Sequence, residues 1–375
     1  MKKRSDLEKL VASISEKYTP DGATKPVIAF GADLKQREFI PCATPVLGYL
    51  ISRGGWPQGQ LIEFFGKEHA GKTTLMTMAL KDCLIHERKN GGERILAIID
   101  VEHRFNPEWA LKLGLVPNED LIVVQPPNAE TATDIMTKLI KSGEICAIGF
   151  DSIGGAATSS SQMEFNEKGT LYGGNANVMK RNVQTVAPLA NLFGVTCFYL
   201  NQLRADMSGY GRAMTPGGHA VKHQMSLRIY IRPGRDKYFD KIGGADTQVG
   251  FPMVFKSVKN SYGPFGREQW SDFYYTPSRW KDTVGFDIER DYARLGILLN
   301  VVEQRGGGNY SWREVKERGR DTFFEKLRER GLQEEFMKDV LQAFSREVAS
   351  VTVEEGDSLL QMPETDGSLD VSDET

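Results

Sequence analysis

The sequence predicts an α/β fold built on a mostly parallel, twisted sheet with helices on both faces. Short apolar runs, rich in β-branched or aromatic residues, recur at 61–65, 94–100, 121–125, 145–151, 195–202 and 227–232. Segments long enough for helices separate these runs, and the first five runs look like buried parallel strands. The first run also leads directly into a glycine-containing loop and a helical pattern, which is the usual order in such a fold.

The N-terminal residues 1–39 are expected to form a helix and a linker. Ser5 is a plausible N-cap for a helix over 5–18, with Glu8 completing a capping box. The apolar residues at helical spacing are Leu7, Leu10, Val11 and Ile14. A short helix with no obvious core of its own can pack on this chain or on a neighbour.

The rest of the chain divides into three expected parts. The core covers 40–280, and its later segments, 249–260 and 266–275, alternate more and suggest antiparallel additions. Residues 281–350 mix turns with amphipathic helices and suggest a small α+β domain. Residues 351–375 form an acidic segment in which we expect no structure.

The charge is distributed unevenly along the chain. Of the 50 acidic residues, eight lie in 351–375, which has no Lys or Arg, so 47 basic against 42 acidic residues remain elsewhere. An acidic tail on a mildly basic body can compete with a polyanion for the basic surface, although a simple solvated tail is the alternative.

The composition is that of a globular protein, with 40% hydrophobic and 26% charged residues. No apolar run approaches the roughly 20 residues that span a bilayer, and the charged N-terminus lacks a signal-peptide core. We therefore expect a cytoplasmic protein without a membrane partner. The four cysteines are far apart and expected to be reduced and structural: Cys42, Cys83, Cys146 and Cys197.

A phosphate-binding loop follows the first predicted strand. The segment 66–73 fits the pattern GxxxxGK[ST] between a strand and a helix, which is the context that the motif requires. Glycines let backbone N–H groups face the phosphates, Lys72 can reach the β- and γ-phosphates, and the hydroxyl of Thr73 can bind Mg²⁺. The expected nucleotide-binding residues are Gly66, Lys67, Glu68, His69, Ala70, Gly71, Lys72, Thr73 and Thr74.

Two carboxylates follow or end predicted strands on the same edge of the sheet. Asp151 ends the apolar run 145–151 and fits a Walker-B residue that helps to hold Mg²⁺. Glu102 follows the run 94–100 and is a candidate to polarise the attacking water. A solvated loop carboxylate is the alternative for Glu102.

Several motifs together resemble the RecA family of homologous recombinases, bacterial or phage. The resemblance rests on GGWPQGQLIEFFGKEHAGKTTL, IIDVEHRFNPEWALKLG, FDSIGG, NQLR and TPGGHAVK, which keep the family's order over about 40–270. The later stretch GFDIERDYARLGILLNVVEQRGGGNYSW is similar to a recombinase C-terminal domain. The resemblance implies a RecA-type P-loop NTPase core with a short N-terminal oligomerisation helix and a small α+β C-terminal domain.

The resemblance assigns roles to four residues around ATP. Glu102 corresponds to the water-activating carboxylate, and Gln202 to the sensor of the γ-phosphate. Trp109 stands where the family stacks an aromatic residue, often Tyr, on adenine; a place in the core is the alternative. Asn106 stands where the bacterial pattern often has Asp at the adenine. ATP and Mg²⁺ are the implied ligands.

Two glycine-rich loops correspond to the family's DNA-binding loops, at about 158–180 and 203–222. Arg and Lys can contact phosphates, backbone N–H groups near two glycines can do the same, and methionines can wedge between bases. The candidates in the later loop are Arg204, Met207, Arg212, Met214, Gly217, Gly218 and Lys222. Those in the earlier loop are Lys168, Asn175, Lys180 and Arg181, where an ordinary surface loop is the alternative.

One departure from the family concerns the contact between subunits. The resemblance implies two lysines, separated by one residue, that reach the ATP of a neighbouring protomer in a head-to-tail filament. Lys259 matches the first, whereas Ser261 stands at the second position. We expect ATP between protomers, with slower turnover or turnover that depends on Lys259 alone.

The predicted function is a DNA-dependent ATPase that forms helical filaments on single-stranded DNA and catalyses strand exchange with a homologous duplex. Recombination and DNA repair are the implied processes, with single-strand-binding and loader proteins as possible partners. A hexameric helicase or an ATP-switch regulator are the alternatives on the same core. The residues Trp109, Asn106 and Ser261 favour a phage origin, so a bacterial or phage-infected cell is the expected location.

Overall fold

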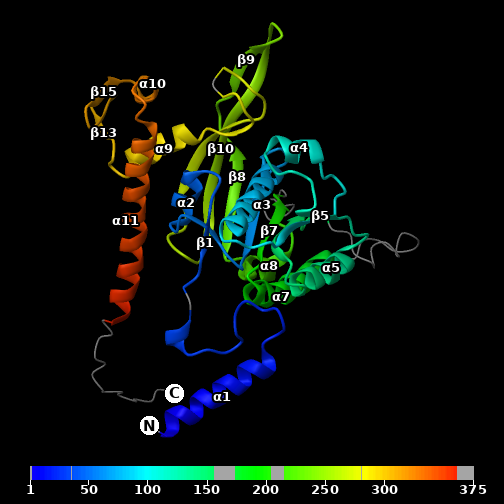
Figure 1. Ribbon diagram of the computed structural model, residues 1–375. Coiled ribbons are helices and arrows are strands. Elements are labelled where there is room, and N and C mark those ends of the chain that lie inside the picture. Colours follow the sequence, from blue (N-terminus) through cyan, green and yellow to red (C-terminus); the bar gives the residue numbers. More distant parts are fainter. Residues whose placement is uncertain (1, 35, 156–173, 204–214, 280, 361–375) are drawn as a thin grey trace, which may run out of the picture. The chain divides into compact units, whose positions relative to one another are not determined.

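The computed structural model describes residues 2–34, 36–155, 174–203, 215–279 and 281–360. The chain divides into two compact units, Met1–Leu295 and Gly296–Thr375. The sheet of the first unit carries the features that matter for function, and its elements are labelled in Figure 1.

Six parallel strands form the centre of the sheet in the first unit, as the apolar runs predict. In order across the sheet they are β5 (Leu121–Val124), β4 (Ile95–Asp100), β6 (Ile145–Asp151), β7 (Thr196–Gln202), β3 (Leu61–Gly66) and β8 (Leu227–Pro233). Because parallel strands end at the same edge, the residues after β3, β4, β6 and β7 come together.

The sheet continues beyond β8 with antiparallel strands, which confirms the antiparallel additions expected from the alternating segments. The long strand β10 (Ala245–Asn260) pairs with β8 and with β11 (Glu268–Tyr274), and β12 (Gly285–Phe286) follows β11. Strand β9 (Tyr238–Ile242) pairs with the first part of β10 and forms a projecting hairpin (Figure 1).

One expectation about burial is wrong. The run 121–125 was expected to be a buried strand, but β5 lies at the edge of the sheet, where Ile122 and Val123 are each 37% exposed. The run is apolar because its strand still packs on one side, whereas the open edge leaves the remaining surface in contact with solvent.

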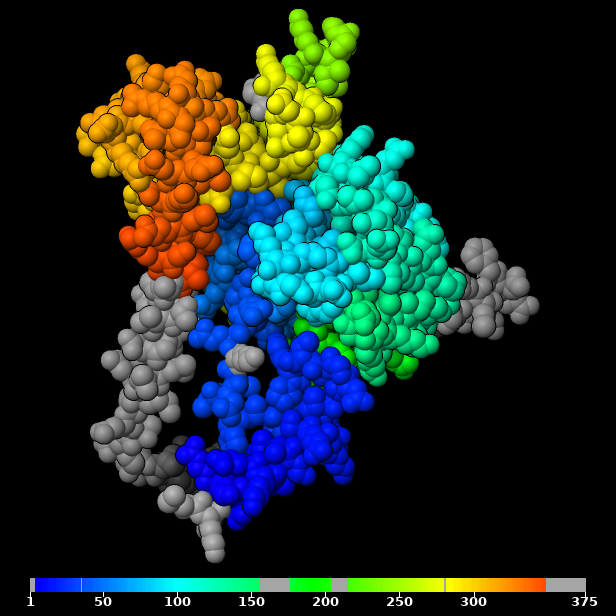
Figure 2. Space-filling view, in the orientation of Figure 1, coloured from blue at the N-terminus to red at the C-terminus, as the bar shows by residue number. Residues whose placement is uncertain are grey.

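Helices cover both faces of the sheet and form two separate cores. On one face, α3 (Lys72–Lys89) and α2 (Pro45–Ile51) bury apolar side chains against the strands; on the other, α5 (Ala129–Lys141), α7 (Gly174–Phe193) and α8 (Gly218–Gln224) do the same (Figure 1). The short helix α4 (Pro107–Lys112) follows β4. The segments of α3, α4 and α5 form a continuous surface in Figure 2.

The start of the first unit contains α1 (Lys2–Tyr18), the 3-10 helix η1 (Gly31–Asp33) and the pair β1 (Phe39–Pro41) and β2 (Gly55–Pro57). The helix α1 leaves Leu7 and Leu10 exposed within the described chain.

The second unit has a three-stranded antiparallel sheet and two helices. Its elements are β13 (Glu303–Arg305), β14 (Asn309–Trp312), β15 (Val315–Arg318), α10 (Arg320–Glu329) and α11 (Gln333–Leu360); α9 (Ile288–Leu298) ends the first unit and begins the second. Phe323, Phe336 and Trp312 form its aromatic core. Helix α11 continues ten residues into the segment for which the sequence predicts no structure, and 361–375 lie outside the described residues.

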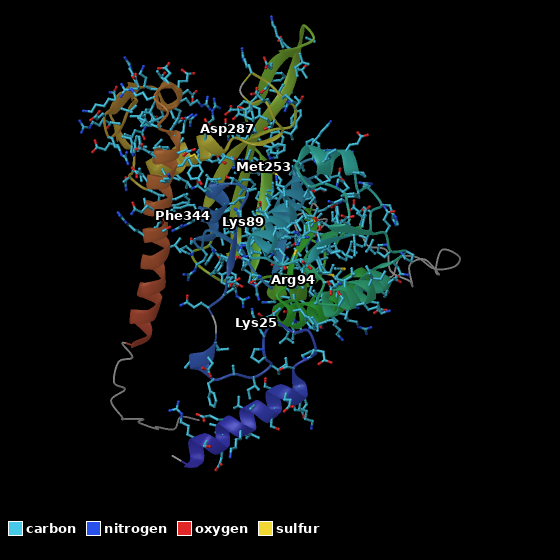
Figure 3. All side chains as sticks on the ribbon, in the orientation of Figure 1. Lys25, Lys89, Arg94, Met253, Asp287 and Phe344 are labelled. Carbon is cyan, nitrogen blue, oxygen red and sulfur yellow. The ribbon has the colours of Figure 1, made fainter. Side chains whose placement is uncertain are left out.

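Side chains fill the interior of both units (Figure 3), with Met253 on β10 among the buried residues of the first. Within the described part of the chain, none of the helices combines the length and the apolar character needed to cross a membrane.

Candidate active site

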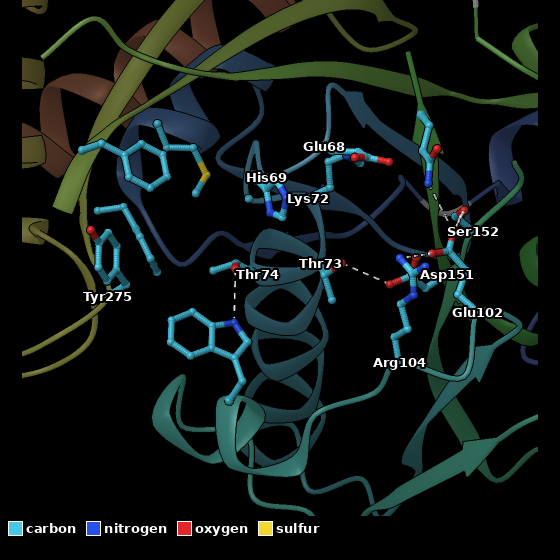
Figure 4. A pocket seen from close by; sticks show the side chains of 16 residues that line it. Glu68, His69, Lys72, Thr73, Thr74, Glu102, Arg104, Asp151, Ser152 and Tyr275 are labelled. Carbon is cyan, nitrogen blue, oxygen red and sulfur yellow. Dashed lines mark hydrogen bonds and ion pairs between the residues drawn. The ribbon is translucent and has the colours of Figure 1, made fainter. Parts of the chain in front are cut away.

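A cavity of about 570 Å³ lies at the carboxyl ends of the parallel strands (Figure 4). Its polar lining comes from the phosphate loop and from the ends of β4, β6 and β7, and consists of Glu68, His69, Gly71, Lys72, Thr73, Thr74, Glu102, Arg104, Asp151, Ser152 and Gln202. Its apolar lining consists of Trp109, Phe251, Met253, Phe273 and Tyr275. The volume and the division into polar and apolar ends suit a nucleotide.

The phosphate loop connects β3 to α3 with a backbone that two glycines make possible. A Cβ atom on Gly66 would lie 2.2 Å from the carbonyl oxygen of Ile231, and one on Gly71 would lie 2.4 Å from the Cε of Met253. Gly71 is also the N-cap of α3 with a φ of 90°, a left-handed conformation that favours glycine. The helix N-terminus therefore opens toward the cavity without side chains in the way.

Lys72 is the first residue of α3 and folds back over the loop. Its Nζ donates a hydrogen bond of 2.7 Å to the carbonyl oxygen of Lys67. Burial lowers the pKa of Lys72, and the nearby carboxylates of Asp151, Glu102 and Glu68 oppose that shift. An ammonium group at this place can bind phosphate oxygens.

Thr73 and Asp151 meet at the base of the cavity. The hydroxyl of Thr73 donates a hydrogen bond of 3.1 Å to Oδ2 of Asp151. Burial, followed by the charge of Glu102, raises the pKa of Asp151 to about 6. A divalent cation beside these oxygens would offset that concentration of negative charge.

The donor set fits Mg²⁺ bound together with a nucleotide. Across the residues that the structure describes, no three His, Cys, Asp or Glu side chains gather to hold a metal alone. Mg²⁺ at phosphates usually takes only one or two protein oxygens, with phosphate and water as the other ligands. Thr73 and Asp151 are the residues that can supply them.

Glu102 lies where the sequence predicts a residue that orients water. Its side chain is 14% exposed, and Oε1 accepts hydrogen bonds from the hydroxyl of Ser152 and, at 3.4 Å, from Nε2 of Gln202. Its other oxygen, Oε2, lies 3.4 Å from Nη1 of Arg104. The structure thus brings Glu102 and Gln202 together and adds Ser152 and Arg104 to them.

Trp109 and Asn106 lie in different places relative to the cavity. Trp109 is half-buried, lines the cavity, and donates a hydrogen bond of 3.2 Å from Nε1 to the hydroxyl of Thr74 (Figure 4). Asn106 is the N-cap of α4, and its Oδ1 accepts a 3.0 Å bond from the N–H of Trp109. Among the described residues, Asn106 is not part of the cavity lining.

Apart from Trp109, the apolar lining of the cavity was not identified from the sequence motifs. Phe251 and Met253 belong to β10, Phe273 belongs to β11, and Tyr275 follows β11. Only the antiparallel pairing beyond β8 brings these side chains opposite the phosphate loop. The alternation of 249–260 was the available signal, because it marks one face of that strand as inward.

The candidate DNA-binding residues are only partly within the described structure. Lys168, Arg204, Met207, Arg212 and Met214 lie outside the described residues. Lys180 and Arg181 are exposed on α7, Asn175 belongs to the first turn of the same helix, Gly217 is the N-cap of α8, and Gly218 and Lys222 lie in α8.

The two expected loops are therefore shorter than the sequence suggests. Helix α7 begins at Gly174, inside the loop predicted for 158–180. Helix α8 begins at Gly218, inside the loop predicted for 203–222. Burial of Met179 and Val221 on the second core explains both helices, since packing overrides the weak helix propensity of their glycine-rich starts.

Lys259 belongs to β10, and its side chain contacts the C-terminal end of α8. It does not line the cavity of its own chain. Its Nζ donates to the carbonyl oxygens of Lys222, at 3.1 Å, and His223, at 2.7 Å. Burial, followed by the charge of Arg228, lowers the pKa of Lys259. At the second position, the N–H of Ser261 donates to the carbonyl oxygen of Ser226.

Comparisons with known proteins agree with this site. The family described as the RecA N-terminal domain matches residues 7–277. Protein RecA of Thermus thermophilus is 30% identical over 360 residues, which cover 95% of this chain and 99% of the relative. Protein RecA of Bacteroides thetaiotaomicron is 31% identical over 323 residues, covering 85% of this chain and 91% of that relative. These matches favour the recombinase interpretation over a helicase or a regulator.

Proposed function

The chain belongs to the RecA family of DNA-dependent ATPases of recombination and repair, and we propose that its cavity binds ATP with Mg²⁺ while the protein forms filaments on single-stranded DNA. The observation that carries this proposal is the contact between Glu102 and Gln202 in the lining of the cavity. Glu102 is suited to orient water, and Gln202 ends β7, which is followed in the chain by 203–214. The contact therefore connects the two.

We assign the phosphate end of the cavity as follows. The loop N–H groups and Lys72 bind the phosphates, and Thr73 and Asp151 would hold Mg²⁺, which would supply positive charge near the phosphates. Glu102 orients a water molecule and accepts its proton. The water oxygen bonds to the terminal phosphorus as the bond to the bridging oxygen breaks, which gives ADP and inorganic phosphate.

The apolar end of the cavity suits adenine. Trp109 offers an indole ring for stacking, and Tyr275 and Phe251 line the side formed by the antiparallel strands. Asn106 contributes to adenine binding indirectly, because its side chain caps α4, the helix that carries Trp109.

DNA would be bound next to the end of β7. The exposed Lys180 and Arg181 on α7 supply positive charge for phosphates. The segment 203–214 follows Gln202 directly in the chain, so Gln202 can link occupation of the nucleotide site to DNA binding. Contacts of this kind bind the backbone and leave sequence recognition to base pairing with the homologous duplex.

Self-assembly would place each ATP between two protomers. Lys259 does not line the cavity of its own chain, and a head-to-tail contact would bring it to the cavity of a neighbour. The exposed Leu7 and Leu10 on α1 offer an apolar contact for such a neighbour. Because its substrate is DNA, the protein would act in the cytoplasm of a bacterial or phage-infected cell, with single-strand-binding and loader proteins as partners.

The first experiment measures ATP hydrolysis with and without single-stranded DNA. We expect strong stimulation by DNA, and its loss in Glu102→Gln, while the variant still binds ATP. Strand exchange between a single strand and a homologous duplex then separates a recombinase from a helicase. Absence of turnover under both conditions would contradict the proposed hydrolysis, and turnover without strand exchange would contradict the recombinase assignment.

A further inference from the structure

Arg104 lines the cavity and adds a positive charge to it, although the sequence motifs did not identify this residue. It is two residues beyond Glu102, on the loop after β4, and its side chain is 79% exposed. Figure 4 shows its side chain beside Glu102, with which it forms an ion pair of 3.4 Å. Among the described lining residues, Arg104 and Lys72 are the two Arg or Lys side chains. Arg104 therefore shares the phosphate end of the cavity with the lysine of the loop.

The backbone of Arg104 is fixed although its side chain is exposed. Its N–H donates a bond of 3.0 Å to Oδ1 of Asp100, and the N–H of Phe105 donates one of 3.0 Å to Oδ2. Asp100 is buried, and Gln125 also donates to its Oδ2 at 3.0 Å. The loop thus holds the Cα of Arg104 in place, while the long side chain can change rotamer.

The two oxygens of Glu102 have different partners. Oε1 accepts hydrogen bonds from Ser152 and Gln202, whereas among the described residues Oε2 is paired with the guanidinium of Arg104. Oε2 is therefore the oxygen available for a water molecule. The guanidinium of Arg104 occupies the side of Oε2 that a water molecule would need, so Arg104 must move away before Glu102 can orient water through this oxygen.

We propose that Arg104 binds the terminal phosphate of ATP in the same chain, and that it pairs with Glu102 when this phosphate is missing. The proposal rests on the proposed function, which places ATP in this cavity. A phosphate carries more charge than one carboxylate and accepts two parallel N–H bonds from a guanidinium. An ion pair with so exposed a partner is weak and gives way easily.

This exchange would give Arg104 two effects on hydrolysis. Its charge stabilises the terminal phosphate as negative charge develops there, which is the action of an arginine finger supplied within one chain. Its departure leaves Oε2 of Glu102 free to orient water. Both effects require the terminal phosphate, so Arg104 and Glu102 together distinguish ATP from ADP.

The test compares the binding of ADP with that of an ATP analogue whose β,γ-bridge is an imido group, both with Mg²⁺ and the full chain. We measure the wild type, Arg104→Ala, Arg104→Lys and the control Lys112→Ala, which removes another exposed cation from the same region. We expect Arg104→Ala to weaken analogue binding by about tenfold or more and to leave ADP binding within about twofold. Arg104→Lys should lie between, and the control should match the wild type.

Hydrolysis gives an independent readout. Arg104→Ala should lower kcat by roughly 100-fold with DNA present, and added guanidinium ion should restore part of it. A wild type that prefers the analogue to ADP, with an unchanged ratio in Arg104→Ala, would overturn the proposal. Faster hydrolysis in Arg104→Ala with that unchanged ratio would overturn it too, because the residue would then only restrain Glu102. If the wild type binds neither nucleotide, the proposed function itself fails.

Discussion

The carboxylate of Glu63 and the amide of Asn201 form a 2.7 Å hydrogen bond in the centre of the sheet. The second oxygen of Glu63 accepts a hydrogen bond from Nε of Arg228. Asn201 also donates to the carbonyl oxygen of Pro216 at 3.0 Å, and Arg228 to the hydroxyl of Thr215 at 3.2 Å. This buried network joins β3, β7 and β8 to the residues that precede α8.

Removing one partner of this network should strongly destabilise the protein. Glu63→Ala leaves the buried guanidinium of Arg228 without its carboxylate, which costs about 3–5 kcal/mol of unfolding free energy. Urea unfolding measures the loss. The control is Arg232→Ala, which breaks the ion pair between Arg232 on β8 and Glu268 on β11. Both partners of that pair are exposed. A loss below about 1 kcal/mol for Glu63→Ala would show that the network does not stabilise the sheet.

Gln202→Ala should weaken the stimulation of ATP hydrolysis by single-stranded DNA. Nε2 of Gln202 donates to Glu102, and its backbone N–H donates to the side chain of Asn201 at 2.9 Å, so the residue connects the cavity with the end of β7. We expect ATP binding to change little and stimulation by single-stranded DNA to fall by about tenfold or more. Steady-state hydrolysis with increasing DNA checks this, with Gln304→Ala in the second unit as control. Undiminished stimulation would contradict the connection.

The strands and the phosphate loop could be predicted because their signals are local. Each parallel strand is a short apolar run between loops, and the loop's glycines and lysine are adjacent in the chain. The wall formed by Phe251 and Tyr275 could not be predicted in this way. It depends on β10 and β11 pairing beyond β8, at a sequence separation of about 180 to 200 residues from the loop that they face.

The helix boundaries show a second limit of local reasoning. The segment before Val183 is rich in glycine and asparagine and suggests a loop, yet α7 begins at Gly174. Met179, Val183 and Val186 all pack in the second core, at helical spacing. Tertiary burial of that face outweighs the propensity of the first turn, and this burial is invisible until the sheet has been assembled.

Asp82 should make stability depend on pH. It is buried in the first core, where its Oδ2 accepts bonds from Nε1 of Trp56, at 3.0 Å, and from the N–H of Ala43, at 2.7 Å. Burial raises its pKa from 3.8 to about 7. The folded state therefore binds a proton that the unfolded state releases between pH 4 and 7. The contribution to stability is complete below pH 4 and is lost as the pH rises to 7.

Asp82→Asn is the matched variant, because its Oδ1 can keep both hydrogen bonds without titrating. Relative to the variant, the wild type should lose about 3 kcal/mol of unfolding free energy between pH 5 and pH 8, with little further change above pH 8. Urea unfolding of both proteins at four pH values measures this difference. A constant difference across the range would mean that Asp82 has an ordinary pKa.

Trp109 should contribute to nucleotide binding through its ring more than through its N–H group. Trp109→Ala removes the stacking surface and should weaken ATP binding by about tenfold, whereas Trp109→Phe keeps a smaller aromatic ring without the bond to Thr74 and should stay within about fivefold. Equilibrium binding of ATP and of a pyrimidine nucleotide measures both affinity and base preference. Equal affinity in the wild type and Trp109→Ala would place the base elsewhere.

Lys259 and Glu102 should act on the same ATP from different protomers. Lys259→Ala and Glu102→Gln should each abolish most DNA-stimulated hydrolysis when tested alone. In a mixed filament, a Lys259→Ala protomer keeps its own Glu102 and receives Lys259 from a Glu102→Gln neighbour. Random assembly of an equal mixture makes about one quarter of the interfaces complete, so about a quarter of the wild-type turnover should return. A mixture as inactive as its components would instead place both residues in the same chain's site. The control for simple dilution is an equal mixture of the wild type with the double variant Lys259→Ala, Glu102→Gln.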